Sequence, residues 1–380
     1  MKKVFRYLKK ELMLTVSLLA AAAGLIITPP KADFFAAIDW RTLGTLLMML
    51  CVLEGFKKEN VLKPVENLAS RIKTAAGLSL FLIFGVFFTS MFVTNDVSLI
   101  IFVPLTILLF RSGEREELIL PVISMENIAA IRGSLLMPFG SPQNLFLYGQ
   151  AKQVGFLRFM LHMSPLCVMS AVLLIIFVLV LYRKNVREKI IFTHESGEWD
   201  KERQPQRITY ILLFVLVMIV IVTRTSLWWA ALIAVIAAIF TADRKIFLRV
   251  DYVLILTFLC FFIFSSSIAG NEKISQYLGS WVAGREYWWA IGLSQIISNV
   301  PASIVLYPFS KNFAGLIYGA DTSGLCSLIG SLASVINYRI YVREYPGRGG
   351  KFVKTFTLIS WAFFAVVVLP GYFLSKWKFF

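Results

Sequence analysis

Two polar segments interrupt long apolar runs of this chain, one in each half. Thr94-Asn95 and Ser298-Asn299 both place a hydroxyl residue before an asparagine, and a proline follows nine residues after each asparagine. A helix broken in apolar surroundings exposes the N–H groups of one half-helix, which favour an anion. It also exposes the carbonyl groups of the other half-helix, which favour a sodium ion or a proton donor. Both segments are therefore candidates for binding small ions.

A second pair of breaks follows the first pair. Gly140-Ser141 matches Gly330-Ser331, and Asn144 matches Ser334. Prolines and glycines in the first copy predict an unwound helix, whereas the second copy lacks both prolines. One Ser-Asn pair alone would be typical of a helix–helix hydrogen bond, but two matched pairs favour a binding site. The candidate residues are Thr94, Asn95, Asp96, Gly140, Ser141, Gln143, Asn144, Ser298, Asn299, Gly330, Ser331 and Ser334.

Charged side chains inside apolar runs are costly and tend to be functional. Asp96 either binds a coupling cation, carries a proton, or only caps the half-helix that follows it. Arg132 either contacts an anionic substrate or forms an ion pair, for which Asp96 is the expected partner. Glu126 is six residues from Arg132, which puts the two on roughly opposite helix faces and makes them unsuited to pair.

The composition predicts that helices crossing a membrane position these residues. Of 380 residues, 58% are hydrophobic and only 16% are charged, against about 25% charged in soluble proteins. The net charge of +16 comes from basic residues clustered between apolar runs, which is typical of cytoplasmic loops rather than of nucleic-acid binding. The spacing of the cysteines and histidines indicates neither a disulfide framework nor a metal site.

The order of spans follows from the apolar runs and the basic loops. The runs lie at approximately 12–28, 42–55, 76–110, 118–149, 158–182, 208–223, 226–241, 250–269, 287–310, 314–340 and 354–375. Basic residues hold the N-terminus in the cytoplasm and flank 76–110 on both sides, so this run is predicted to be a hairpin that enters from the inside. By alternation, 287–310 is a hairpin that enters from the outside.

These assignments predict an all-α polytopic membrane protein built as an inverted repeat, with two helical hairpins and broken transmembrane helices. Residues 1–182 form the first repeat with the inner hairpin 76–110. Residues 183–225 form a cytoplasmic loop and a linking helix, and residues 226–380 form the inverted second repeat with the outer hairpin 287–310.

Together, the two hairpin tips and the segment Pro138-Phe-Gly-Ser-Pro-Gln-Asn144 resemble the ion transporter superfamily. The closest branches are the citrate-transporter-like and arsenite-permease-like proteins and the divalent-anion/sodium symporters. The resemblance covers nearly the whole chain. It implies an anion site between the tips with cations beside each tip, a homodimer, and an elevator-type motion. In sodium-coupled dicarboxylate members both tips read Ser-Asn-Thr, whereas Asp96 here is more similar to the arsenite-permease type.

We therefore expect a secondary active transporter in the cytoplasmic membrane, moving a small inorganic or organic anion with a proton or sodium gradient. The alternative is a sodium/proton antiporter, which Asp96 favours. No nucleophile–base arrangement indicates an enzyme, and no cofactor is expected beyond a transported or coupling Na⁺ or H⁺. The chain has no P-loop pattern and so hydrolyses no ATP itself, although the resemblance to arsenite pumps leaves an ATPase partner open. The other expected partners are the lipid bilayer and the small anion.

Overall fold

The computed structural model describes residues 12–29, 38–61, 68–69, 72–183, 189–190 and 204–377. The basic N-terminal residues, part of the basic loop before the first hairpin and most of the charged loop 183–207 lie outside these ranges. Within the described part the regular elements are helices, with one isolated antiparallel bridge between Thr74 and Lys189.

The helices fall into two successive sets along the chain. The first comprises α2 (Leu12–Ile27), α3 (Trp40–Lys58), α5 (Ala75–Val93), α6 (Asn95–Ser112), α7 (Glu116–Ser134), α8 (Pro142–Gln150), α9 (Phe156–Leu181) and α10 (Gln204–Thr223). The second comprises α11 (Trp228–Asp243), η2 (Arg244–Leu248), α12 (Tyr252–Ala269), α13 (Glu272–Val282), α14 (Glu286–Ile297), α15 (Asn299–Leu306), η3 (Tyr307–Phe309), α16 (Phe313–Ser323), α17 (Leu332–Glu344) and α18 (Gly349–Ser375).

Each predicted apolar run coincides with one helix or with two helices that a short break separates. Among the described residues, six helices are long and apolar enough to cross a membrane, namely α5, α6, α9, α10, α12 and α18. Helix α13 was not expected from the sequence, because its 11 residues mix polar and apolar types and are too few to span a bilayer.

The outward faces of the long helices carry large apolar side chains. Examples are Leu179 of α9, Ile219 of α10 and Leu369 of α18, which are 47%, 53% and 54% exposed. Rows of such residues on several neighbouring helices suit contact with lipid chains rather than water. The structure is that of a multi-pass membrane protein.

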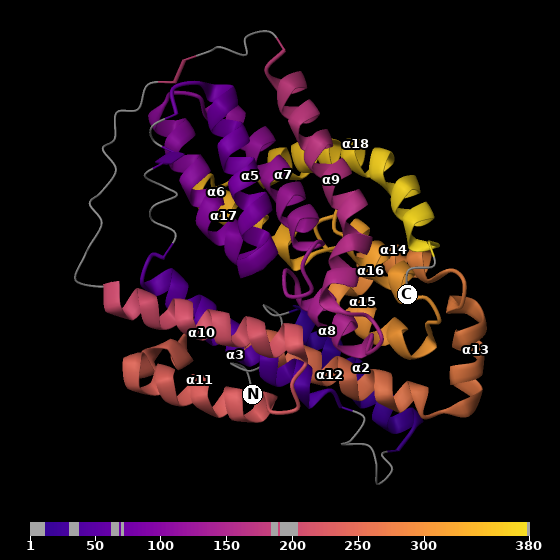
Figure 1. Ribbon diagram of the computed structural model, residues 1–380. Coiled ribbons are helices and arrows are strands. Elements are labelled where there is room, and N and C mark those ends of the chain that lie inside the picture. Colours follow the sequence, from indigo (N-terminus) through magenta and orange to yellow (C-terminus); the bar gives the residue numbers. More distant parts are fainter. Residues whose placement is uncertain are drawn as a thin grey trace.

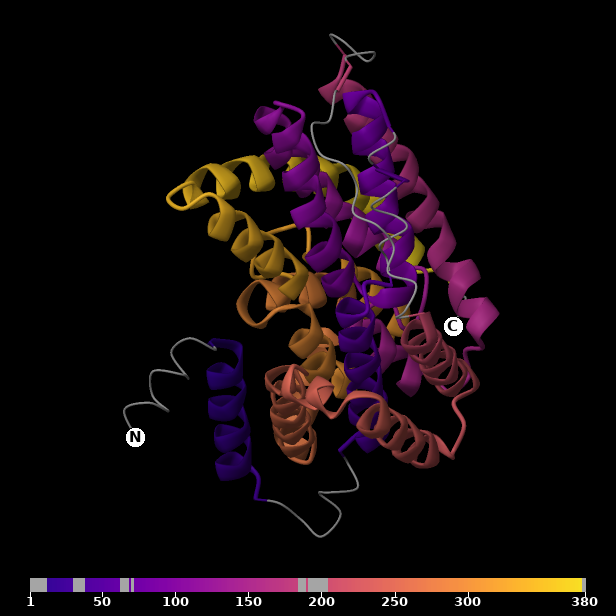
Figure 2. The ribbon, with the colours of Figure 1, turned by 90° about the vertical axis from the view of Figure 1, so that its left-hand side faces the viewer.

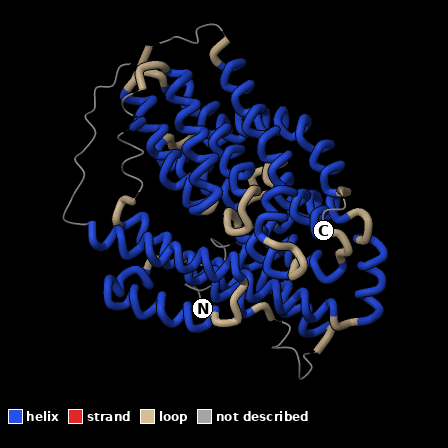
Figure 3. Tube along the Cα trace, viewed as in Figure 1, coloured by secondary structure: helices blue, strands red, loops and turns tan. Residues whose placement is uncertain are grey.

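The helices form two groups (Figures 1 and 2). In the first group, which we call the frame, α2 packs along α12, and α3 packs against α10, α11 and α12. The second group, which we call the bundle, contains α5 to α9 and α14 to α18. The frame contacts the bundle chiefly where α12 meets α15 and η3. Figure 3 shows non-helical segments inside the helical body as well as at its ends.

Loops that are distant in sequence meet at two ends of the structure. At one end, Ile190 N donates to Lys73 O at 2.9 Å, and Arg111 forms an exposed ion pair with Glu344 at 3.4 Å. At the other end, residues 150–154, 311–314 and 375–377 line one pocket of about 500 Å³. The first end gathers loops that the charge pattern places in the cytoplasm, and the second gathers loops that it places outside.

Candidate functional site

A single residue separates the two helices of each interrupted segment. Thr94 lies between α5 and α6 with φ 74° and ψ 154°, and Ser298 lies between α14 and α15 with φ 70° and ψ 160°. This region of backbone conformation is almost restricted to glycine and costs about 1–3 kcal/mol for other residues. Both tips therefore keep a hydroxyl residue in a conformation that favours glycine.

The chain reverses direction at Thr94. Across this tip the Thr89 hydroxyl donates to the Ser98 hydroxyl at 3.1 Å. Further from the tip, a Cβ at Gly85 would lie only 2.4 Å from the Phe102 ring, so the two helices are closely packed and antiparallel. The turn places the N-terminus of α6 at the tip, where the first backbone N–H groups of a helix have no carbonyl partner within that helix.

Each tip is tied to the break that follows it by the same backbone hydrogen bond. Asn95 N donates to Gly140 O at 3.2 Å, and Asn299 N donates to Gly330 O at 3.2 Å. The two glycines fit because a Cβ at Gly140 would lie 2.4 Å from Ser134 O, and one at Gly330 would lie 2.3 Å from Ser323 O. The second segment thus breaks as the first does, although it has no proline.

The breaks separate α7 from α8 and α16 from α17. At the first break, Asn144 Nδ2 donates to Ser134 O at 3.2 Å. At the second, Ser334 Oγ lies 3.5 Å from Gly324 O and accepts from Asn127 Nδ2 at 3.0 Å. Helix α8 packs against α15, and α17 packs against α6, so each break adjoins the hairpin of the other half. Ser141 and Ser331 precede α8 and α17 and are buried.

Several buried polar atoms around the first break have no hydrogen-bond partner within the described part of the chain. They are Ser141 Oγ, Gln143 Oε1 and Asn144 Oδ1. Buried polar groups are normally paired, and unpaired ones call for an explanation such as a bound ion or ligand. The arrangement provides oxygen atoms for a cation, and hydroxyl and amide groups for an anion, beside the helix N-terminus of α8.

Arg132 is fully buried and pairs with Asp321 of α16. Its second terminal nitrogen lies 3.4 Å from the Thr322 hydroxyl. The expectation that Asp96 is its partner is therefore wrong, because Asp321 supplies the counter-charge from the other half of the chain. As expected, Glu126 does not pair with Arg132; its carboxylate accepts from the Thr106 hydroxyl of α6.

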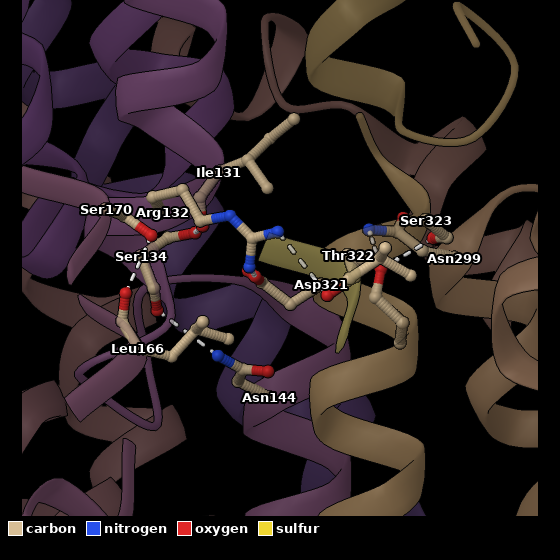
Figure 4. A network of polar contacts seen from close by, with 12 residues as sticks. Ile131, Arg132, Ser134, Asn144, Leu166, Ser170, Asn299, Asp321, Thr322 and Ser323 are labelled. Carbon is tan, nitrogen blue, oxygen red and sulfur yellow. Dashed lines mark hydrogen bonds and ion pairs between the residues drawn. The ribbon is translucent and has the colours of Figure 1, made fainter. Parts of the chain in front are cut away.

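The network around Arg132 reaches the second tip (Figure 4). Asn299 Nδ2 donates to Ala320 O at 3.3 Å, one residue before Asp321. Ser323 Oγ donates to the same carbonyl at 2.7 Å. Asp321, Thr322 and Ser323 were missed from the sequence. A signal existed, since Asp321 is the one acidic residue in the apolar run 314–340.

The hydroxyl groups of the two tips do not cap the half-helices that follow them. Thr94 and Ser298 occupy the N-cap positions, yet neither side chain makes a capping hydrogen bond. Asn95 Oδ1 instead accepts from the neighbouring Asp96 N at 2.9 Å. Asp96 is partly exposed, and its Oδ1 atom is buried without a partner. These side chains are consequently not committed to capping.

Helices that cross the membrane, paired breaks and buried polar groups define a membrane transporter. A sequence model of the family described as "Citrate transporter" matches residues 8–323, so the chain belongs to the citrate transporter family. It is 30% identical over 319 residues to the inner membrane protein YbiR of Escherichia coli (strain K12), covering 80% of this chain and 81% of that protein. It is also 30% identical over 363 residues to the uncharacterized transporter MJ0456 of Methanocaldococcus jannaschii, covering 93% and 94%.

The fold is similar to that of a solved structure, the YdaH transporter of Alcanivorax borkumensis. The TM-score is 0.55 with 14% sequence identity, and the match covers 92% of this chain and 88% of that one. The membership in a transporter family means that the chain is not an enzyme.

Proposed function

We propose that this protein is a secondary active transporter of a small inorganic or organic anion, driven by a proton or sodium gradient. The observation that carries the proposal is the matched pair of tips. Thr94 and Ser298 hold hydroxyl groups at the cost of backbone strain, and strain of this kind clusters at functional sites. Glycine would remove the strain, so its absence from both tips indicates that the hydroxyl groups are needed.

The chemistry of the tips suits an anion flanked by cations. Helices α6 and α15 begin at Asn95 and Asn299, so their N-terminal N–H groups and positive partial charge face the tips. The carbonyl ends of α5 and α14 and the side-chain oxygens suit a coupling cation. Asp96 adds the only formal charge at either tip, and we assign it the coupling cation or proton. The site we propose comprises the twelve residues of the two tips and two breaks predicted above.

The matching hydrogen bonds between tip and break in the two halves support an inverted repeat. Its two copies comprise residues 1–182 and 226–380, and residues 183–225 join them. In such a repeat the two hairpins open to opposite sides and the substrate binds between them. Loops meet at two ends of the structure, and this supports the proposed orientation. In that orientation the protein lies in the cytoplasmic membrane with its N-terminus and Arg111 on the cytoplasmic side and Lys311 on the outer side. A homodimer with elevator-type motion of the bundle against the frame follows from the resemblance to the superfamily.

A sodium/proton antiporter is the second candidate. The observation that favours it is Asp96, whose buried Oδ1 atom has no partner. An antiporter needs a carboxylate that exchanges a proton for a sodium ion, and Asp96 is placed to do so. It does not need a second, anion-binding tip, which is why the matched tips favour anion transport.

Uptake into proteoliposomes separates the two functions. Labelled citrate, succinate, phosphate, sulfate and arsenite are offered singly, with a pH or a sodium gradient imposed separately. Accumulation of one anion that depends on one gradient supports the proposed function and names the coupling ion. Sodium-dependent proton movement without uptake of any anion contradicts it in favour of the antiporter.

A further inference from the structure

Arg132 and Asp321 occupy corresponding positions on α7 and α16. Each lies two residues before the serine that ends its helix, Ser134 or Ser323. Each of these serines donates to the carbonyl of the third residue before it, at 3.0 Å in the first half and 2.7 Å in the second. The matched glycine of the following break also packs on the same serine carbonyl. The ion pair thus joins equivalent points of the two halves.

The pair lies between the first break and the second tip. Ser134, two residues after Arg132, accepts from Asn144 of the first break at 3.2 Å. Ala320, one residue before Asp321, accepts from Asn299 of the second tip at 3.3 Å. Figure 4 shows these groups around the ion pair. A change in the pair can therefore reach both halves of the proposed binding site.

The hydrogen bonding of the pair is incomplete at both ends. Arg132 Nε and Asp321 Oδ1 are buried and have no hydrogen-bond partner among the residues that the structure describes, and the contact of Arg132 with Thr322 is long, at 3.4 Å. A buried ion pair offsets its desolvation only when its remaining donors and acceptors are satisfied. Here a planar guanidinium with an unsatisfied Nε–H donor is paired with a single carboxylate oxygen, which is a less complete match than an anion bound through two oxygens would give.

In the described part of the chain, Arg132 is the only charged side chain that interacts with Asp321. The other titratable groups that face Asp321 are Tyr287 of α14, Tyr318 of α16 and Cys167 of α9. All three are neutral near neutral pH. The local charge is therefore set by the pair alone, and it is zero when Arg132 is protonated and Asp321 is ionised.

We propose that Asp321 is a built-in competitor of the transported anion for Arg132. In the protein without substrate, the Asp321 carboxylate forms an ion pair with Arg132. Asp321 takes up one H⁺ from the aqueous compartment that the site faces and becomes a neutral carboxylic acid, and Arg132, which keeps its positive charge, is then free to bind an anion. Unloading reverses both steps. This inference rests on the proposed anion transport, makes a proton the coupling ion, and assigns that proton to Asp321 in place of Asp96.

Charge balance defines the substrate class. The empty site holds one guanidinium and one carboxylate, and the loaded site holds one guanidinium, one neutral acid and one anion. Both are neutral only if the bound anion carries a single negative charge. A neutral site avoids the large cost of an uncompensated charge in a low-dielectric interior. The site therefore selects a monoanion, such as a monocarboxylate or a singly ionised oxyanion, with one proton per anion.

The test compares Asp321→Asn with the wild type, using binding of acetate and of lactate, two monocarboxylates whose single negative charge stays constant from neutral to alkaline pH. In the wild type the apparent Kd rises about tenfold per unit of pH once Asp321 is ionised, because one proton is bound with each anion. In Asp321→Asn the amide is always neutral, so binding at alkaline pH is tighter than in the wild type and pH dependence from this site is lost. Uptake then no longer responds to a pH gradient. Arg132→Gln abolishes binding.

Two controls keep the result interpretable. Glu344→Gln removes a carboxylate from an exposed ion pair with Arg111 and should leave binding and pH dependence as in the wild type. The double variant Arg132→Gln/Asp321→Asn restores charge balance and should fold without binding the anion. If Asp321→Asn does not fold, infrared difference spectra of the wild type test the protonation of Asp321 instead. Addition of the anion must then produce a new band from a protonated carboxyl group.

The outcomes that overturn the inference are distinct from those that overturn anion transport. Retention of the wild-type pH dependence by folded Asp321→Asn contradicts the role of Asp321. Loss of binding by that variant at every pH, driving of uptake by sodium alone, or absence of the carboxyl band also contradicts it. If the wild type takes up none of the anions offered, the proposed function itself fails.

Discussion

Arg132 and Asp321 come from equivalent positions of two helices and form a fully buried ion pair with each other. Among the described residues no other charged side chain interacts with Asp321, so Arg132 is the counter-charge that stabilises its ionised form. Removing one partner leaves an unpaired buried charge, whereas removing both does not.

This relationship predicts a non-additive effect on stability. Arg132→Gln should lower the free energy of unfolding by about 3–5 kcal/mol, because Asp321 then lacks its counter-charge. The double variant with Asp321→Asn should be less destabilised than Arg132→Gln alone. The apparent melting temperature of purified protein measures both effects, and additive losses would mean that the pair does not act as a unit.

The strained tips predict opposite effects on stability and transport. Thr94→Gly or Ser298→Gly should relieve the backbone and raise the free energy of unfolding by about 1 kcal/mol. The same variants lose the hydroxyl group and should transport more slowly. The control is Glu114→Gly, at another residue with positive φ away from the tips, which should leave transport unchanged. Transport at the wild-type rate by both tip variants would show that the two hydroxyl groups are not needed for transport.

The two break glycines should tolerate no side chain. Gly140→Ala and Gly330→Ala would each place a Cβ within 2.4 Å of a backbone oxygen, so the break or its helix must shift, at a cost of about 1–3 kcal/mol. Gly292→Ala on α14 is the matched control, because its Cβ would meet nothing within 4 Å. Thermal stability and uptake are measured for all three, and equal behaviour would contradict the close packing of the breaks.

The proposed orientation predicts which loops are accessible from outside. Lys311→Cys should react with a membrane-impermeant maleimide on intact cells, and Arg343→Cys should react only after the membrane is opened. Both cysteine variants are made in a protein that already carries Cys326→Ser. This removes the partly exposed native cysteine, whereas the other three native cysteines are buried. Labelling of Arg343→Cys on intact cells would reverse the orientation.

The apolar runs were sufficient to predict most helices, because about 20 apolar residues are needed to cross a bilayer. The second break was predicted without a proline, from the match of Gly330-Ser331 to Gly140-Ser141. Helix α13 could not be found in this way, because it is short and amphipathic.

The details of the site depended on three-dimensional packing. The partner of Arg132 lies 189 residues away, and no local spacing connects them. The backbone at Thr94 was unexpected for a different reason, since threonine is not a residue that local preference places at positive φ. The hydrogen bond from Asn95 N to Gly140 O holds the tip in that conformation, and this contact between distant segments is not visible in the local sequence.

The most direct measurement is anion uptake by Asn95→Ala and Asn299→Ala in proteoliposomes, for the anion that the wild type accumulates. Asn271→Ala is the control, because it removes an asparagine from the N-terminus of α13, where the side chain accepts from Ile274 N at 3.2 Å. We predict that both tip variants insert and fold normally but lose uptake, while Asn271→Ala retains it. Full uptake by both tip variants would contradict the assignment of the two tips as the anion site.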